Sequence, residues 1–241
     1  MTTPSLMDNR TDGSSVRPAM ASVVAVVSQK GGAGKTTLAI HLAAAAIRTS
    51  QVSLVIDTDP QASASRWAEW RLGIPPEVID SAPPRIAAKI ASASQQGAEL
   101  IVIDTPPHAD LAASKAVECA DLVLIPCRPS AFDLAAMRTT IRLVELMQKR
   151  ASVIFTAGPP NAPLIYGDAR EVAEGFGASV CPVNLPDRAA YRHAVAGGKT
   201  VFDIEPDAKA AREIEQLHRW ACEQLNMSTP SHPMPHERST A

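Results

Sequence analysis

Short continuous runs of apolar residues recur along this chain and alternate with segments of helical periodicity. The apolar runs occupy residues 22–27, 52–56, 100–103, 122–125 and 151–155, with a weaker sixth run at 179–183. Because they are continuous rather than alternating, they indicate strands that are covered on both faces. The segments between and after them predict helices over residues 35–48, 61–72, 84–96, 111–119, 130–150, 167–176, 187–196 and 205–225.

This alternation of strands and helices predicts an α/β fold with a doubly wound, mostly parallel sheet between two helical layers. Neither an internal repeat nor a linker interrupts the pattern, so we expect one domain over residues 22–226. The flanking residues 1–21 and 227–241 are rich in Ser, Thr and Pro and lack periodicity. We expect them to form a disordered N-terminal tail and a flexible C-terminal tail.

The composition is that of a globular protein, with 46% hydrophobic and 20% charged residues in 241. Its 23 basic and 25 acidic residues argue against a protein that coats nucleic acid with its whole surface, although a local basic patch stays possible. The four cysteines form no metal or disulfide pattern, and no apolar run has the roughly 20 residues of a membrane helix. We therefore expect a cytoplasmic protein.

The strongest chemical signal is KGGAGKTT at residues 30–37, directly after the first strand and opening the first helix. Glycines remove Cβ atoms, so the backbone can curl and aim its N–H groups at phosphate oxygens, and the helix N-terminus favours the same anion. Lys35 would reach the β and γ phosphates, and the Thr36 hydroxyl would bind Mg²⁺. The predicted nucleotide contacts are Lys30, Gly31, Gly32, Ala33, Gly34, Lys35, Thr36 and Thr37.

Two acidic motifs, DTDPQ at 57–61 and DTPP at 104–107, each end an apolar strand. Carboxylates at the carboxyl ends of parallel strands face the crevice where ligands bind. Asp104 could therefore hold the water shell of Mg²⁺. Asp57 and Asp59 could line the same site, or they could cap the next helix, because Pro60 suits a first helical position.

The phosphate loop departs from the general pattern GxxxxGK[ST], since Gln29 stands in place of the first glycine and Lys30 is an additional lysine. KGGAGKTT resembles the deviant Walker A motif of the ParA/MinD group of P-loop ATPases. DTDPQ resembles the second signature of ParA-type members, and DTPP resembles the start of their switch II. The three motifs occur in the family order, and the resemblance extends over residues 22–200.

This resemblance implies an ATPase that binds ATP and Mg²⁺, forms a homodimer in the ATP state and hydrolyses ATP weakly until a partner stimulates it. It implies catalytic roles for Lys30, Lys35 and Asp59. Lys30 would cross the dimer interface to the partner's nucleotide, as an arginine finger does, and Asp59 would orient or activate the attacking water. Asp57 would line the site, and Thr36 and Asp104 would be the metal residues.

Residues 187–199, DRAAYRHAVAGGK, carry the predicted DNA-binding residues Arg188, Arg192 and Lys199. Arg188 and Arg192 are spaced i,i+4, which would place them on one helical face. The segment resembles the one that supplies DNA-contacting arginines in partition ATPases. That likeness implies binding to nonspecific double-stranded DNA through phosphate neutralisation, association with the nucleoid and a ParB-like adaptor as the stimulating partner. A solvated basic face stays an alternative, as it does for a second stripe at Arg138, Arg142 and Lys149.

Relatives with the same fold do other work, so the partition of a plasmid, a chromosome or another cargo has alternatives. A MinD-like positioning ATPase would need a membrane-binding C-terminal helix. The polar face at 209–225 mixes Glu with Arg, whereas a membrane anchor favours Lys and Arg, so we expect no stable membrane association. A cluster-binding relative would need a cysteine near DTPP, so Cys119 and Cys127 are interpreted as buried thiols. A noncatalytic ATP-dependent switch is the third alternative.

Overall fold

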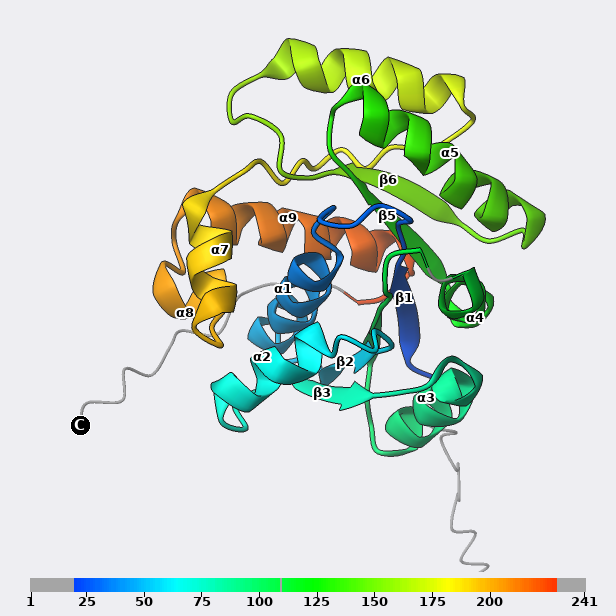
Figure 1. The fold of residues 1–241 in the computed structure, drawn as a ribbon. Coiled ribbons are helices and arrows are strands. Elements are labelled where there is room, and N and C mark those ends of the chain that lie inside the picture. Colours follow the sequence, from blue (N-terminus) through cyan, green and yellow to red (C-terminus); the bar gives the residue numbers. More distant parts are fainter. Residues whose placement is uncertain (1–19, 109, 229–241) are drawn as a thin grey trace, which may run out of the picture.

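One parallel sheet of six strands organises the domain in the computed structural model, which describes residues 20–108 and 110–228. The strand order is β3-β2-β4-β1-β5-β6, and every neighbouring pair is parallel (Figure 1). This arrangement confirms the predicted doubly wound α/β fold. The strands are β1 Ser22–Val26, β2 Ser53–Asp57, β3 Glu77–Asp80, β4 Leu100–Asp104, β5 Leu122–Cys127 and β6 Ala151–Phe155.

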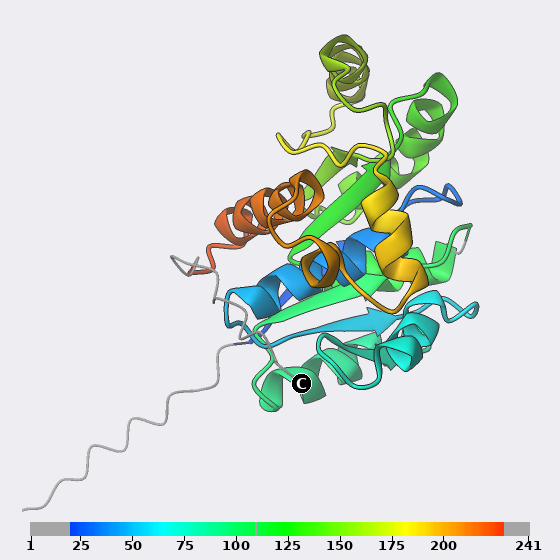
Figure 2. The same ribbon diagram turned by 90° about the vertical axis from the view of Figure 1, so that its left-hand side faces the viewer.

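Helices cover both faces of this sheet (Figure 2). One layer contains α1 Lys35–Arg48, α2 Ser63–Arg71, α7 Ala189–Ala196, α8 Val201–Ile204 and α9 Lys209–Gln224. The other contains α3 Ile86–Gln95, α4 Asp110–Cys119, α5 Ala131–Leu146 and α6 Pro163–Gly175, with the short 3₁₀ helix η1 Pro83–Arg85 before α3. No helix within residues 20–108 and 110–228 is long and apolar enough to cross a membrane.

The two hydrophobic cores explain why the strands are continuously apolar. Along β1, Val24 and Val26 point into the core beneath α1 and α9, whereas Val23 and Ala25 point into the core beneath α4 and α5. Successive strand residues face opposite sides of a sheet, so a strand covered on both faces needs apolar residues at every position.

The register brings the predicted motifs to one edge of the sheet. Asp104 at the end of β4 lies beside Val26 at the end of β1 and beside Asp57 at the end of β2. The phosphate loop leaves β1 at this same edge. The carboxyl ends of three neighbouring strands therefore deliver KGGAGKTT, DTDPQ and DTPP to one place.

The predicted strand at 179–183 is wrong. One isolated parallel bridge joins Val180 to Val153 of β6, and a second joins Leu185, beyond this segment, to Thr156 directly after β6. Pro182 has no N–H to continue the ladder, and the Val183 N–H turns to the Cys181 Sγ at 3.4 Å. The parallel pairing is therefore interrupted between the two bridges.

The sixth strand of the sheet is instead β3, which the apolar pattern missed. Its four residues, Glu77 to Asp80, are exposed or half-buried, and they pair only with β2 at the edge of the sheet. A strand with one neighbour and little burial lacks the continuous apolar run by which the central strands are recognised.

Several helix boundaries also differ from the prediction. The helix expected over 130–150 ends at Leu146, and the one expected from 167 begins at Pro163, since proline suits a first helical turn. The segment expected to be one helix from 205 to 225 contains only α9, and a separate turn, α8, precedes it. The predicted tails, 1–21 and 227–241, lie almost entirely outside the described residues.

Candidate nucleotide site

The phosphate loop requires glycine at two of its turns. Gly32 has φ 70° and Gly34, the N-cap of α1, has φ 86°, a left-handed conformation that side-chain-bearing residues rarely adopt. With Gly34 in this conformation, α1 begins directly at Lys35. The free N–H groups at the N-terminus of α1, a largely buried helix, therefore lie at the loop, where they favour the binding of an anion.

Lys35 lies beneath the loop rather than in solvent. Its side chain is 7% exposed, and its Nζ donates a hydrogen bond to the Lys30 carbonyl at 3.0 Å. Burial lowers the pKa of Lys35, while the carboxylates of Asp104 and Asp59 oppose the shift. The ammonium group therefore stands between the loop and two carboxylates, where the phosphates of a nucleotide would meet it.

Asp104 is fully buried, and neither carboxylate oxygen has a hydrogen-bond partner among the described residues. Burial raises the pKa of Asp104 to about 7; the charges of Asp57 and Asp59 add to the shift, whereas the Thr36 hydroxyl and Lys35 oppose it. Buried carboxylate oxygens are normally paired. The unpaired oxygens, next to the Thr36 hydroxyl, form a hard oxygen donor set that fits Mg²⁺.

Asp57 and Asp59 have different environments. Asp57 is buried: its Oδ1 accepts from the Asp59 N–H at 3.0 Å, and its Oδ2 accepts from the Ser65 N–H and hydroxyl at 2.9 and 3.0 Å. Asp57 thus connects the loop after β2 to the first turn of α2. This role resembles the helix cap that was one of the two interpretations of its sequence. Asp59 is half-buried, accepts from the Gln61 N–H at 2.8 Å and lies near enough to Lys35 and Asp104 to affect their pKa values.

A cavity of about 320 Å³ adjoins the phosphate loop. Its walls come from the loop and α1, from the segment after β6 and from the start of α7. The lining residues are Gly32, Gly34, Thr37, Leu38, Arg128, Thr156, Ala157, Leu185, Pro186, Asp187, Arg188, Tyr191, Arg192 and Ile214. A mixed apolar and polar cavity beside a phosphate loop suits a nucleoside.

The three predicted DNA-binding residues have different surroundings: Arg188 and Arg192 both line the cavity, whereas Lys199 is not among its lining residues. Arg188 precedes α7 as its N-cap, and its guanidinium forms an ion pair with Glu213 through both Nε and Nη2. Arg192 is exposed and pairs with Asp187, while Lys199 lies exposed beyond the end of α7. The expected shared helical face is therefore wrong, because only Arg192 belongs to the helix.

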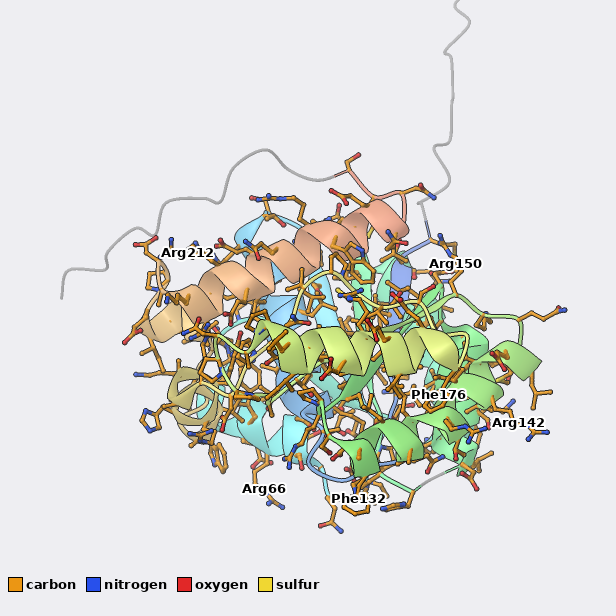
Figure 3. The ribbon with its side chains drawn as sticks, turned by 90° about the horizontal axis from the view of Figure 1, so that it is seen from above. Arg66, Phe132, Arg142, Arg150, Phe176 and Arg212 are labelled. Carbon is orange, nitrogen blue, oxygen red and sulfur yellow. The ribbon has the colours of Figure 1, made fainter. Side chains whose placement is uncertain are left out.

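The second basic stripe is also divided. Arg138 stacks over the Phe176 ring at 5.0 Å, and Lys149 donates to the Ala120 carbonyl at 2.9 Å. Arg142 is exposed on α5, and its side chain points outward in Figure 3. Arg138 is exposed as well but packs on Phe176, and Lys149 is half-buried, so the three residues of the stripe have different surroundings.

His41 joins the phosphate-loop helix to the C-terminal helices, a role that its sequence context does not signal. It is fully buried; its Nδ1 bonds to the Thr37 carbonyl at 2.7 Å, and its Nε2 accepts from the Val201 N–H at 3.2 Å. In a protonated ring Nε2 would carry a hydrogen and could no longer accept from the Val201 N–H, so two donors would face each other. Burial lowers the pKa of His41 to about 4 from 6.5.

We expect this depressed pKa to make stability fall as the pH is lowered. The unfolded state takes up the His41 proton near pH 6.5 and the folded state only near pH 4. The stabilisation is therefore complete above about pH 6.5 and is lost towards pH 4, by on the order of 1.4 kcal/mol per pH unit. Urea unfolding at pH values from 7.5 to 4.5 measures the free energy of unfolding and hence this loss. His41→Leu should flatten the curve, whereas exposed His193→Leu should not; parallel curves for the wild type and His41→Leu would contradict the expectation.

The comparisons with known proteins agree with this geometry. Residues 24–201 match the model of the CobQ/CobB/MinD/ParA nucleotide binding domain. The maintenance of carboxysome distribution protein A of Halothiobacillus neapolitanus is 31% identical over 82% of this chain and 94% of its own length. The protein of the same name from Gloeobacter kilaueensis is 34% identical over 85% of this chain and 94% of its own length.

Solved structures share the fold at lower identity. The cell division ATPase MinD of Pyrococcus furiosus superposes with a TM-score of 0.68 at 17% identity, covering 86% of this chain and 99% of MinD. The ATP complex of a single-residue variant of Cyanothece McdA gives 0.65 at 17% identity, covering 87% of this chain and 98% of McdA. The sequence match over residues 24–201, with its three motifs at one sheet edge, establishes that the chain belongs to the ParA/MinD family of P-loop ATPases.

Proposed function

We propose that this chain is a ParA-type ATPase whose ATP-bound dimer binds double-stranded DNA nonspecifically and distributes a cargo over it. The observation that carries the proposal is the pairing of two lysines in one phosphate loop. Lys35 is buried beneath the loop, whereas Lys30 is half-buried at its rim. One lysine can thus serve the nucleotide of its own chain while the other reaches the nucleotide of a second copy.

In this mechanism Lys35 contacts the β and γ phosphates, and Thr36 and Asp104 hold Mg²⁺. The metal, when bound, would neutralise negative charge on the phosphate oxygens. Asp59 positions the attacking water, and Lys30 of the second copy adds positive charge where negative charge develops. Such a trans cation contributes about 10³–10⁵ in rate in well-studied nucleotide hydrolases.

The cargo that the comparisons favour is a large protein assembly. Two relatives above 30% identity over more than 80% of both chains are named for the maintenance of carboxysome distribution. Proteins named for chromosome partitioning, such as Soj of Thermus thermophilus, match at 23% identity over 80% of this chain. We therefore propose that an adaptor bound to such an assembly stimulates ATP hydrolysis, as a ParB-like partner would.

The proposed DNA contacts are Arg192 and Lys199, which are both exposed. Their role is to neutralise DNA phosphates, so that the ATP-bound protein, which we place in the cytoplasm, associates with the nucleoid. Arg192 pairs with Asp187, but both side chains of that pair are more than half exposed, whereas the Arg188–Glu213 pair is largely buried, so Arg188 is less suited. A membrane-bound mode has less support: α9 buries Ile214 and Leu217 in the core of the domain, so its apolar face is not available to lipid.

Binding to random-sequence duplex DNA, measured with Mg-ATP, Mg-ADP and no nucleotide, tests this proposal. We expect binding with ATP alone, weakened steeply by salt and lost in Arg192→Ala/Lys199→Ala. The matched control is Arg85→Ala/Lys89→Ala, which removes two exposed cations near the start of α3. Because Arg192 borders the cavity, nucleotide binding by its variant is measured as well. Equal, negligible DNA binding in all three states would overturn the proposal.

A further inference from the structure

Side chains outside the phosphate loop hold two of its carbonyl groups. The Arg128 Nη2 donates to the Gly32 carbonyl at 2.7 Å, and the Thr156 Oγ1 donates to the Ala33 carbonyl at 2.9 Å. With Lys35 on the Lys30 carbonyl, three carbonyls of the loop have a side-chain donor. Neither Arg128 nor Thr156 belongs to a nucleotide motif of the sequence.

These bonds fix the direction of the peptide N–H groups. In a planar trans peptide the C=O and the following N–H point to opposite sides. A donor on the Gly32 carbonyl therefore turns the Ala33 N–H away from Arg128, and a donor on the Ala33 carbonyl turns the Gly34 N–H away from Thr156. Successive N–H groups directed to one side form a concave site for an anion.

The two donors are built on neighbouring strands. Arg128 follows β5 and Thr156 follows β6, and the Thr156 N–H donates to the Cys127 carbonyl at 2.9 Å, which joins the two strand ends. Thr156 is buried, so its hydroxyl cannot exchange the loop carbonyl for solvent easily. Both residues line the cavity beside the loop. Donors on the ends of a rigid sheet hold a loop more accurately than donors on another loop.

The surroundings of Arg128 favour a positioning role over a surface ion pair. It forms no ion pair with an acidic residue in the described ranges 20–108 and 110–228, and its hydrogen bond goes to Gly32. A Cβ on Gly32 would lie 3.3 Å from the same nitrogen, so the guanidinium packs directly against the turn.

We propose that Arg128 and Thr156 are positioning residues that hold the phosphate loop in its anion-binding shape before nucleotide arrives. The proposal rests on the nucleotide-binding part of the function proposed above and not on DNA binding. Preorganisation reduces the cost of ordering the loop on binding. Loss of one such bond is expected to weaken phosphate binding about 5- to 10-fold.

The test measures binding of Mg-ADP and of inorganic pyrophosphate to the full chain by calorimetry. Thr156→Val, which keeps the shape but lacks the hydroxyl, should raise both dissociation constants about 5- to 10-fold, and Thr156→Ser should restore them. Thr140→Val is the matched control, because Thr140 is a buried threonine of α5 whose hydroxyl has no hydrogen-bond partner in the described residues. It should bind both ligands as the wild type does.

Arg128 supplies an independent variant if Thr156→Val does not fold. Arg128→Met should weaken both ligands, and Arg128→Lys should stay weak if reach to Gly32 matters rather than charge. Wild-type affinity in Thr156→Val or Arg128→Met, full rescue by Arg128→Lys, or equal losses in Thr156→Ser and Thr156→Val would overturn the proposal. A wild-type chain that bound no nucleotide would instead overturn the nucleotide site itself, and this inference with it.

Discussion

Replacing Lys35 by methionine is expected to weaken binding of Mg-ATP by at least about 100-fold, because the charge-assisted hydrogen bonds to the β and γ phosphates are lost together. The ammonium is buried beneath the loop and is the cation that faces both Asp104 and Asp59 there. Without it, the phosphates would meet these two carboxylates uncompensated. Titration with a fluorescent ATP analogue measures the loss.

The control for this substitution is Lys115→Met, which removes a lysine that pairs with Glu118 on the surface of α4. It should bind the analogue as the wild type does. The thermal midpoint of Lys35→Met without nucleotide shows whether the fold persists. Retention of wild-type affinity by a folded Lys35→Met chain would contradict the site described above.

Asp59→Ala is expected to lower the turnover of ATP by about 100-fold or more, the usual scale for a residue that positions or activates water. ATP affinity should stay within about 3-fold, because removing a carboxylate near the phosphates takes away repulsion as well as a contact. Asp59 is half-buried at the rim, and its own hydrogen bond is to the local Gln61 N–H, so the loop can tolerate its loss. Phosphate release, measured with the stimulating partner or DNA present, gives the rate.

Two aspartates serve as comparisons. Asp80→Ala, at the exposed end of β3, should leave turnover unchanged. Asp57→Ala should unfold the start of α2, because it removes the acceptor of three hydrogen bonds. Turnover by Asp59→Ala at the wild-type rate would show that another group positions the water.

The site was predictable where it depends on local sequence and on parallel pairing. Glycines at 32 and 34 have the left-handed backbone that the motif requires, and Lys35 directly opens α1. Because parallel strands end at the same edge, the apolar runs before Asp57 and Asp104 were enough to place both carboxylates beside the loop.

Contacts between distant segments were not predictable. Arg128 and Thr156 lie far from the loop in the sequence, 96 and 123 residues from the carbonyls that they hold, and nothing in their own neighbourhoods marks them as loop donors. By its spacing in the sequence, Arg188 is a suitable DNA contact. In the structure Glu213, on another helix, forms an ion pair with it, and the sequence around Arg188 does not reveal this partner. The edge strand β3 was missed for a related reason, since its single neighbour leaves no strong apolar pattern.

The most direct test of a nucleotide-dependent dimer is the mass of the Asp59→Ala chain in solution, measured by light scattering in Mg-ATP and in Mg-ADP. Slow turnover keeps ATP intact in this variant, so its association state reports the bound nucleotide. We predict the mass of two chains with ATP and of one chain with ADP. The same mass with both nucleotides, although both are bound, would contradict the account.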